Sequence, residues 1–206
     1  MGKDAVFFLR RINEDMSNVV ERARAALVRI DSGGRGAGAG TIWHPEGLIL
    51  TNAHVAGGRS LRVTLPNGKT QPARLIAHDK IHDLAALTVE GNGLPAVDLG
   101  NSDRLEPGDW VVALGHPWGV HGAATAGVVI AVSVPPEMDS MDREFIQVSL
   151  HLRPGHSGGP LVDAQGRLIG VNTMMAGPNV GLAVPVQTIK AFLKERLGQN
   201  TAVAPA

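Results

Sequence analysis

Hydrophobic residues follow two different periods along the chain, and the change between them predicts how it is organised. From residue 12 to residue 27 they recur at helical spacing, with charged residues on the opposite side. We therefore expect an amphipathic helix that leads into a first strand near residues 26–30. Beyond residue 40 the apolar runs are short and closely separated by turn residues, which is typical of β-strands. Helical spacing returns at 186–197, where Pro185 suits a first-turn position.

The predicted strands fall into two groups on either side of a linker near 91–107. Asn67-Gly68 stands between two apolar runs of the first group and is a strong hairpin signal. Many short strands in two groups predict an all-β fold of two barrels. The predicted segments are an N-terminal segment (1–24), a main unit (25–198) with barrels at about 25–98 and 105–185 and a helix at about 186–197, and a flexible tail (199–206).

Composition and charge exclude several classes of function. The chain has no cysteine, which excludes thiol nucleophiles, cysteine-based zinc sites and disulfides. Lys plus Arg and Asp plus Glu both number 19, and Tyr is absent, so we expect no nucleic-acid binding. No segment approaches the roughly 20 apolar residues of a membrane span. The run at 6–9 is too short for an export signal, so a cytoplasmic location is expected.

The segment from Arg153 to Pro160 contains the strongest candidate nucleophile, Ser157. A serine hydroxyl needs a neighbouring base, and the oxyanion that forms on attack needs N–H donors held in place. The glycines around Ser157 allow a tight turn in which consecutive N–H groups point to one place. We expect the N–H groups of Gly155 and Ser157 to be these donors, with that of His156 between them. Taken alone, the segment also fits a plain glycine-rich turn.

The order of residues along the chain decides between two hydrolase folds for Ser157. Gly-His-Ser-Gly-Gly also satisfies the G-x-S-x-G elbow of α/β-hydrolases, but that fold needs a histidine after the serine. No histidine follows Ser157 in this chain. The order His, Asp, Ser, which is that of chymotrypsin, remains.

His54 and Asp83 are the candidates for the other two positions of a catalytic triad. His54 follows an apolar strand, and an imidazole pKa near 6.5 suits proton transfer at neutral pH. Asp83 precedes the apolar run 84–89, where its carboxylate can orient the His54 ring. His78 and His82 lack the Glu of a zinc-protease motif and are interpreted as loop histidines. We expect neither a metal nor a cofactor.

Three segments resemble the catalytic blocks of the HtrA (Deg) serine proteases, and further matches run from about residue 18 to residue 197. The segments are Leu50-Thr51-Asn52-Ala53-His54-Val55, His82-Asp83-Leu84-Ala85-Ala86-Leu87 and Pro154-Gly155-His156-Ser157-Gly158-Gly159-Pro160-Leu161. The resemblance implies two six-stranded antiparallel β-barrels of the trypsin-like type with the active site between them. It also implies a homotrimer, since aromatic residues of the N-terminal segment, here Phe7 and Phe8, help to build trimers in that family.

The chain departs from the family pattern at several places. It ends soon after the last helix, where the family usually continues into a PDZ domain, and His156 replaces the usual Asn. His151-Leu152-Arg153 replaces Ala-Ile-Asn, and in chymotrypsin-like folds the position of His151 is the base of the S1 pocket. Leu152 favours a small or medium aliphatic P1 residue, whereas an inward-pointing His151 would accept an acidic one. The same resemblance assigns Asn172, Thr173 and Leu182 to the S1 pocket.

Two functions are compatible with these residues. The first is a serine endopeptidase that cleaves unfolded or exposed polypeptides, as in protein quality control. The second is a latent protease with an intact triad that acts mainly as a polypeptide-binding, chaperone-like protein. The sequence does not report the conformation of the loop at 153–157, on which the difference depends.

Overall fold

The computed structural model describes residues 3–34, 37–135 and 143–198, so the tail expected at 199–206 lies outside the described residues. The elements in chain order are α1 (Lys3–Ala25), β1 (Leu27–Asp31), β2 (Ala37–His44), β3 (Leu48–Thr51), β4 (Arg62–Thr64), β5 (Thr70–Pro72), β6 (Arg74–Asp79), β7 (Leu84–Thr88), β8 (Trp110–Gly115), β9 (Ala123–Ser133), β10 (Phe145–Val148), β11 (Pro160–Asp163), β12 (Leu168–Gly177), β13 (Val180–Pro185) and α2 (Val186–Leu197). Short 3₁₀ turns at Ser102–Arg104 and Pro117–Gly119 flank β8.

The N-terminal unit is a curved antiparallel sheet. Within the described residues it has seven strands in the order β5-β4-β1-β2-β3-β7-β6. The hairpin expected at Asn67-Gly68 joins β4 to β5, and Gly68 has a φ of +83°, a value that glycine adopts without strain. The edge strands β5 and β6 are separated by Ala73 alone and are two parts of one bent segment. This segment pairs with β4 through β5 and with β7 through β6, and the Ala73 N–H donates to the Leu61 carbonyl oxygen over 2.9 Å.

The C-terminal unit closes on itself. Its order is β10-β13-β12-β11-β8-β9, a six-stranded barrel within the described part of the chain. Each of its pairings is antiparallel, and Ile146, Val148, Leu161 and Ile169 fill its interior. The predicted fold class is therefore confirmed: two β units with a helix at each end. The six-stranded barrel that the resemblance implied forms in the second unit.

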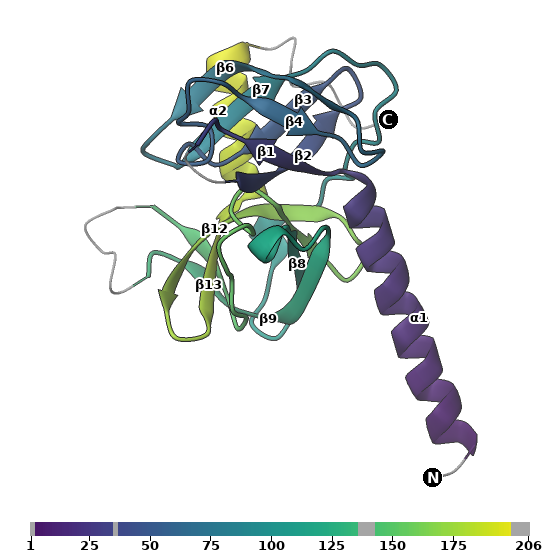
Figure 1. The fold of residues 1–206 in the computed structure, drawn as a ribbon. Coiled ribbons are helices and arrows are strands. Elements are labelled where there is room, and N and C mark those ends of the chain that lie inside the picture. Colours follow the sequence, from purple (N-terminus) through teal and green to yellow (C-terminus); the bar gives the residue numbers. More distant parts are fainter. Residues whose placement is uncertain (1–2, 35–36, 136–142, 199–206) are drawn as a thin grey trace.

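A single apolar cluster joins the two units. It includes Ile42 and Leu87 from the first sheet and Val171 and Val184 from the second. Helix α2 packs against strands of both units through Phe192 and its neighbours Val186, Ile189 and Leu193 (Figure 1). The expected helix at 186–197 thus covers the seam between the sheets and stabilises their relative position by burying apolar surface from both.

Helix α1 is longer than the sequence pattern indicates, because it begins at Lys3 rather than near residue 12. Its last turns pack on the second unit, where Val19 and Ala23 lie among Val112, Leu114 and Val162. Its first turns project away from both sheets (Figure 1). In the described part of the chain, no helix is long and apolar enough to cross a membrane.

Candidate active site

Ser157 lies in the loop that enters β11, directly after a tight turn. The N–H of His156 donates to the Arg153 carbonyl oxygen over 2.9 Å, and Gly155 has a φ of +105°. A hydrogen bond between the first and fourth residues, proline second and positive φ third, fits a type II turn. The residue pattern Pro154-Gly155 therefore determines which way the peptide between these two residues faces.

Two N–H groups of this loop have no acceptor. Among the described residues, no hydrogen bond uses the N–H of Gly155 or that of Ser157. The neighbouring donors are all occupied, since the N–H of His156 binds Arg153 and those of Gly158 and Gly159 bind Asn172 and His156. Unused backbone donors at this spacing are what an oxyanion site requires.

His54 and Asp83 form a close pair across the end of the first sheet. His54 follows β3, and Asp83 stands in the turn before β7, the strand that pairs with β3. The His54 Nδ1 atom lies 2.8 Å from Oδ2 and 3.0 Å from Oδ1 of Asp83. The carboxylate side chain is 11% exposed, whereas the imidazole is 51% exposed and opens to solvent. The buried carboxylate can thus hold Nδ1–H while Nε2 stays available.

Several contacts hold Asp83 in a conformation that few aspartates adopt. Its φ is +54°, and the buried Asn52 side chain donates to its carbonyl oxygen over 3.0 Å. The His54 backbone N–H and the Thr173 hydroxyl donate to its carboxylate at 3.1 and 2.6 Å. Burial raises the pKa of Asp83, but the hydrogen bonds from His54 and Thr173 outweigh it and leave the pKa below its ordinary value. The carboxylate is ionised at neutral pH.

The Ser157 hydroxyl faces Thr173 in this structure. Its Oγ donates to the Thr173 carbonyl oxygen over 3.0 Å, and no hydrogen bond joins it to the His54 ring. Both side chains nevertheless line one cavity of about 240 Å³ between the two units. The cavity is lined by Ser32, Ala37, Gly38, His54, Val55, Pro154, Gly155 and Ser157. Rotation of the serine about its Cα–Cβ bond to another staggered rotamer moves the hydroxyl away from the Thr173 carbonyl.

The His156 side chain supports its own turn, a role that the sequence did not reveal. The Arg153 N–H donates to its Nδ1 over 3.1 Å, so the ring accepts from the first residue of the turn, and the Arg153 carbonyl oxygen lies 3.2 Å from the same nitrogen. Burial, together with the charge of Arg153, lowers the pKa of His156. The Arg153 guanidinium in turn lies 5.0 Å from the centre of the Trp118 ring, a cation–π contact.

The residues expected to form the S1 pocket lie in different environments. His151 is exposed and Leu152 is buried beside the barrel interior. The Asn172 side chain donates to the carbonyl oxygens of Pro160 and Leu114 at 3.0 and 3.3 Å, so its amide connects three strands. Leu182 is fully buried in the apolar cluster between the units. Thr173, as described above, contacts both Asp83 and Ser157.

Met175 is a neighbour of this region that sequence reasoning missed. The Leu152 backbone N–H donates to the Met175 sulfur over 3.2 Å. Met175 lies two residues after Thr173 on β12 and packs in the same apolar cluster as Leu152. Its thioether therefore connects β12 to the segment that precedes Ser157. No short-range signal marks this methionine, since the contact spans 23 residues.

Of the two histidines interpreted as loop residues, His82 stands in a turn, whereas His78 lies on β6, where it pairs with Ala85 of β7. The His82 Nδ1 atom lies 2.8 Å from Asp79 Oδ2, and Asp79 also accepts the N–H of Ile81 and of His82, which closes a loop. In the described part of the chain, no group of three His, Asp or Glu side chains is arranged to hold a metal ion.

Comparison with known proteins identifies the family. A family profile described as "Trypsin-like peptidase domain" matches residues 38–171, a range that contains His54, Asp83 and Ser157. The chain belongs to the trypsin-like peptidase family. Its relatives are HtrA-type: the putative serine protease HhoB of Synechocystis is 40% identical over 160 residues, which cover 75% of this chain and 38% of that protein. The mitochondrial serine protease HTRA2 of Drosophila pseudoobscura is 38% identical over 163 residues, with coverages of 76% and 38%.

Solved structures agree with this trypsin-like peptidase fold. The HtrA-type protease AlgW with tripeptide superposes with a TM-score of 0.82 at 34% identity, over 91% of this chain and 64% of that one. The serine endoprotease from Yersinia pestis gives a TM-score of 0.79 at 29% identity, over 89% of this chain and 67% of that one. The chain spans 38% of the length of the two curated relatives, so it corresponds to one part of them.

Proposed function

We propose that this chain is a serine endopeptidase in which Ser157 is the nucleophile, His54 the general base and then acid, and Asp83 the orienting carboxylate. The proposal rests mainly on the way three strand ends bring His54, Asp83 and Ser157 to the same region. A buried, ionised Asp83 holds the His54 ring at 2.8 Å beside the cavity that Ser157 also lines. On substrate binding the hydroxyl turns from the Thr173 carbonyl to His54 Nε2, which removes its proton as the acyl-enzyme forms.

The oxyanion of the tetrahedral intermediate is stabilised, in this proposal, by the free N–H groups of Gly155 and Ser157. The type II turn supports this role. The ψ angle of its second residue differs by about 150° from that of a type I turn. A change to type I would reverse the Pro154–Gly155 peptide and point the Gly155 N–H away.

The substrates proposed are unfolded or exposed polypeptides, with a small or medium aliphatic residue at P1. The buried Leu152 and the thioether of Met175 support an apolar, narrow pocket, while the exposed His151 gives no support for an acidic P1 residue. Cleavage of exposed segments is the activity expected of a quality-control protease.

The decisive experiment compares wild-type protein with Ser157→Ala in hydrolysis of an unfolded substrate such as casein. We expect the variant to lose about 10⁴-fold or more in kcat. His54→Ala should lose a similar amount, since the two residues act as a unit. Equal hydrolysis by the Ser157→Ala variant and the wild type would refute the assignment.

One observation favours a second function, the latent chaperone-like protein. The Ser157 hydroxyl is bound to Thr173 rather than to His54, so the resting serine is not activated. Labelling by a fluorophosphonate distinguishes the two functions, because it requires an activated serine. Rapid labelling that His54→Ala abolishes supports the protease, and the absence of labelling alongside binding of unfolded protein supports the latent form.

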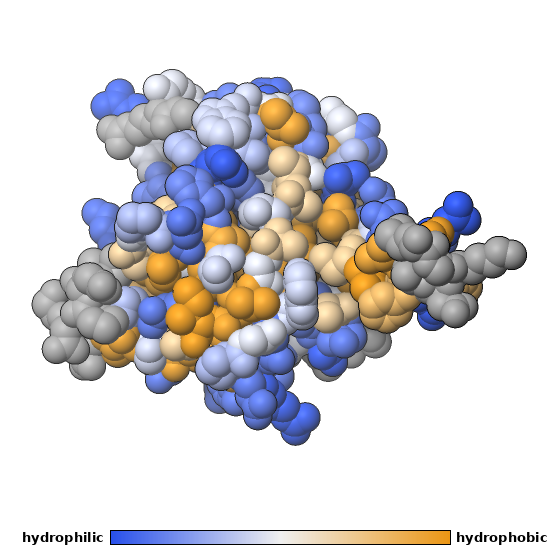
Figure 2. All heavy atoms as spheres, turned by 90° about the horizontal axis from the view of Figure 1, so that it is seen from below, coloured by the Kyte–Doolittle hydropathy of each residue, from blue (hydrophilic) through white to orange (hydrophobic). Residues whose placement is uncertain are grey.

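The free end of α1 supports the proposal of a homotrimer. Phe7 and Phe8 are 73% and 65% exposed, and Leu9 and Ile12 are also exposed. Figure 2 shows hydrophobic residues gathered around this projecting end on the right of the view. We expect sedimentation to give a trimer for the wild type and a monomer for Phe7→Ser with Phe8→Ser. Ile81→Ser, which removes a hydrophobic side chain that is 71% exposed elsewhere, is the matched control.

A further inference from the structure

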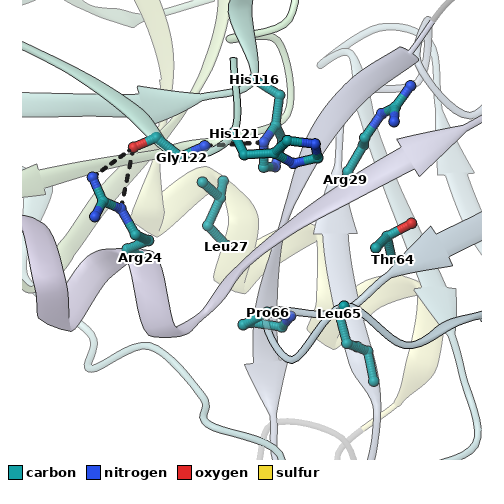
Figure 3. A pocket seen from close by; sticks show the side chains of 10 residues that line it. Arg24, Leu27, Arg29, Thr64, Leu65, Pro66, His116, His121 and Gly122 are labelled. Atoms are coloured by element: carbon teal, nitrogen blue, oxygen red, sulfur yellow. Dashed lines mark hydrogen bonds between the residues drawn. The ribbon is translucent and has the colours of Figure 1, made fainter. Parts of the chain in front are cut away.

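A second cavity lies away from His54 and Ser157, where the end of α1 meets both units (Figure 3). Its volume is about 330 Å³, and three segments enclose it: the junction of α1 with β1, the β4–β5 hairpin and the loop 116–122. It is lined by Arg24, Leu27, Arg29, Thr64, Leu65, Pro66, Gly68, His116, His121 and Gly122. Two arginines and two histidines line this cavity, and no carboxylate does.

One of the two arginines is already occupied. The Nε and Nη2 atoms of Arg24 donate to the Gly122 carbonyl oxygen at 3.2 and 2.9 Å, and Nη1 donates to Glu21 at 2.8 Å (Figure 3). Arg29 differs, because within the described residues its guanidinium has no hydrogen bond and no ion pair. It is partly buried on β1, opposite Thr64 of β4. A partly desolvated guanidinium favours an anionic partner, and its planar fork fits a carboxylate.

The pKa of His116 is lowered to about 4, mainly by burial. The Val28 backbone raises it, and electrostatic repulsion from His121, Arg29 and His156 lowers it further. His116 is therefore neutral at pH 7, and its Nδ1 accepts the Gly122 N–H over 3.2 Å. The exposed His121 ring lies edge-on to it, with the ring centres 5.6 Å apart. An anion beside Arg29 would stabilise this guanidinium.

The remaining wall of the cavity is apolar. Leu27 and Leu65 are 3% and 5% exposed, and Pro66 stands beside Leu65 (Figure 3). The size is at the lower end of the range for small-ligand sites, about 300–1,000 Å³. We propose that this cavity binds a small carboxylate with a short apolar body. The carboxylate would pair with Arg29 and His121, and the apolar body would cover Leu27, Leu65 and Pro66.

The cavity is connected to the proposed oxyanion site by a single loop. The His116 N–H donates to the Gly155 carbonyl oxygen over 2.8 Å. A side chain at Gly155 would clash with the His116 carbonyl oxygen, so the two backbones are in direct contact. A ligand that immobilises loop 116–122 would thus also restrain the turn that presents the Gly155 N–H. This regulatory part of the inference rests on the proposed protease function, whereas binding to the cavity does not.

Binding is tested by ligand-detected NMR titration of the full chain with N-acetyl-leucine, hexanoate, N-acetyl-leucinamide and inorganic phosphate. We expect the two carboxylates to bind with a Kd on the order of 1 mM, as suits so small a ligand. The uncharged amide and phosphate should bind at least about tenfold more weakly. Arg29→Ala should raise the Kd of N-acetyl-leucine by about tenfold. Arg62 is an exposed arginine on β4 outside the cavity, and Arg62→Ala should leave this Kd unchanged.

Three results would overturn the binding site: equal binding of N-acetyl-leucine and its amide, an unchanged Kd in Arg29→Ala, or preferential binding of phosphate. Preference for N-acetyl-leucine over hexanoate would indicate a peptide chain end, and the reverse would indicate a free aliphatic acid.

The regulatory part predicts that saturating N-acetyl-leucine speeds fluorophosphonate labelling of the wild type but not of Arg29→Ala. Equal rates with and without ligand would overturn regulation. Absence of any labelling would count against the protease proposal and leave the binding result intact.

Discussion

The Thr173 hydroxyl donates a hydrogen bond of 2.6 Å to Oδ2 of Asp83, a residue 90 positions earlier in the chain. Thr173 lies on β12 of the closed barrel, and Asp83 immediately precedes β7 of the N-terminal sheet. The Thr173 carbonyl oxygen also accepts the Ser157 hydroxyl. One threonine therefore contacts two proposed triad residues and connects the two units at the site.

Loss of the Thr173 hydroxyl should weaken catalysis without removing any reacting group. We expect Thr173→Val to lower kcat/KM by about tenfold or more, because hydrogen bonds to a charged group contribute roughly 1.5–3 kcal/mol. Thr173→Ser, which keeps the hydroxyl, should stay close to wild type. Steady-state hydrolysis of one peptide by all three proteins checks this, and a fully active Thr173→Val would show that the bond is dispensable.

The hydrogen bond from Thr173 to Asp83 should also change how the stability of the fold depends on pH. The pKa of Asp83 lies below its ordinary 3.8, so its ionised form stabilises the fold above that pH and this contribution is lost as the pH falls. Without the Thr173 hydroxyl the pKa of Asp83 moves back up, and we expect a smaller loss of stability in acid. Urea unfolding of wild type and Thr173→Val at a series of pH values below 5 measures the difference. Parallel curves would contradict it.

The ring of His156 should act as a positioning group for the oxyanion turn. His156→Ala removes the acceptor of the Arg153 N–H, and we expect kcat to fall on the order of 10- to 100-fold with little change in KM. His156→Asn should recover most of this, because an amide oxygen can accept the same N–H. A kcat of His156→Ala equal to that of wild type would mean that the turn holds without the ring.

Met175 should restrict the size of the P1 residue. Met175→Ala removes the thioether that reaches Leu152, and we expect kcat/KM for a Leu or Phe P1 residue to rise roughly tenfold relative to an Ala P1 residue. A peptide series that varies P1 alone measures this. Met174→Ala is the matched control, since Met174 packs against the other apolar cluster. An unchanged preference in Met175→Ala would place the P1 side chain elsewhere.

The half-buried, neutral His116 should make the fold sensitive to acid between pH 6.5 and 4. Its pKa of about 4 in the folded protein lies below the ordinary 6.5, so only the unfolded chain takes up this proton between these values. Stability should therefore fall as the pH drops from 6.5 to 4. His116→Asn, which can still accept the Gly122 N–H, should flatten this part of the curve. Chemical denaturation across pH 4–7 provides the measurement.

The sequence pattern predicted the fold class, which the structure confirms, and it supplied the three residues that we propose as the triad. Local signals carried these predictions: the spacing of apolar residues, the Pro154-Gly155 turn, and the order His54, Asp83, Ser157. These signals do not report contacts between residues that lie far apart in the chain. The side chains of Asn172 and Leu182 are used for barrel packing and inter-unit contact.

The sequence by itself determined that a glycine-flanked serine, a strand-end histidine and a strand-start aspartate occur in the order of a trypsin-like peptidase, because turn chemistry and periodicity are properties of neighbouring residues. Only the tertiary structure decided which side chains support them. Four features depend on how the strands pack. They are the hydrogen bond from Thr173 to Asp83, the contact of the His156 ring with its own turn, the contact of Met175 with Leu152, and the cationic cavity at Arg29. These contacts join elements whose separation in the chain leaves no local pattern.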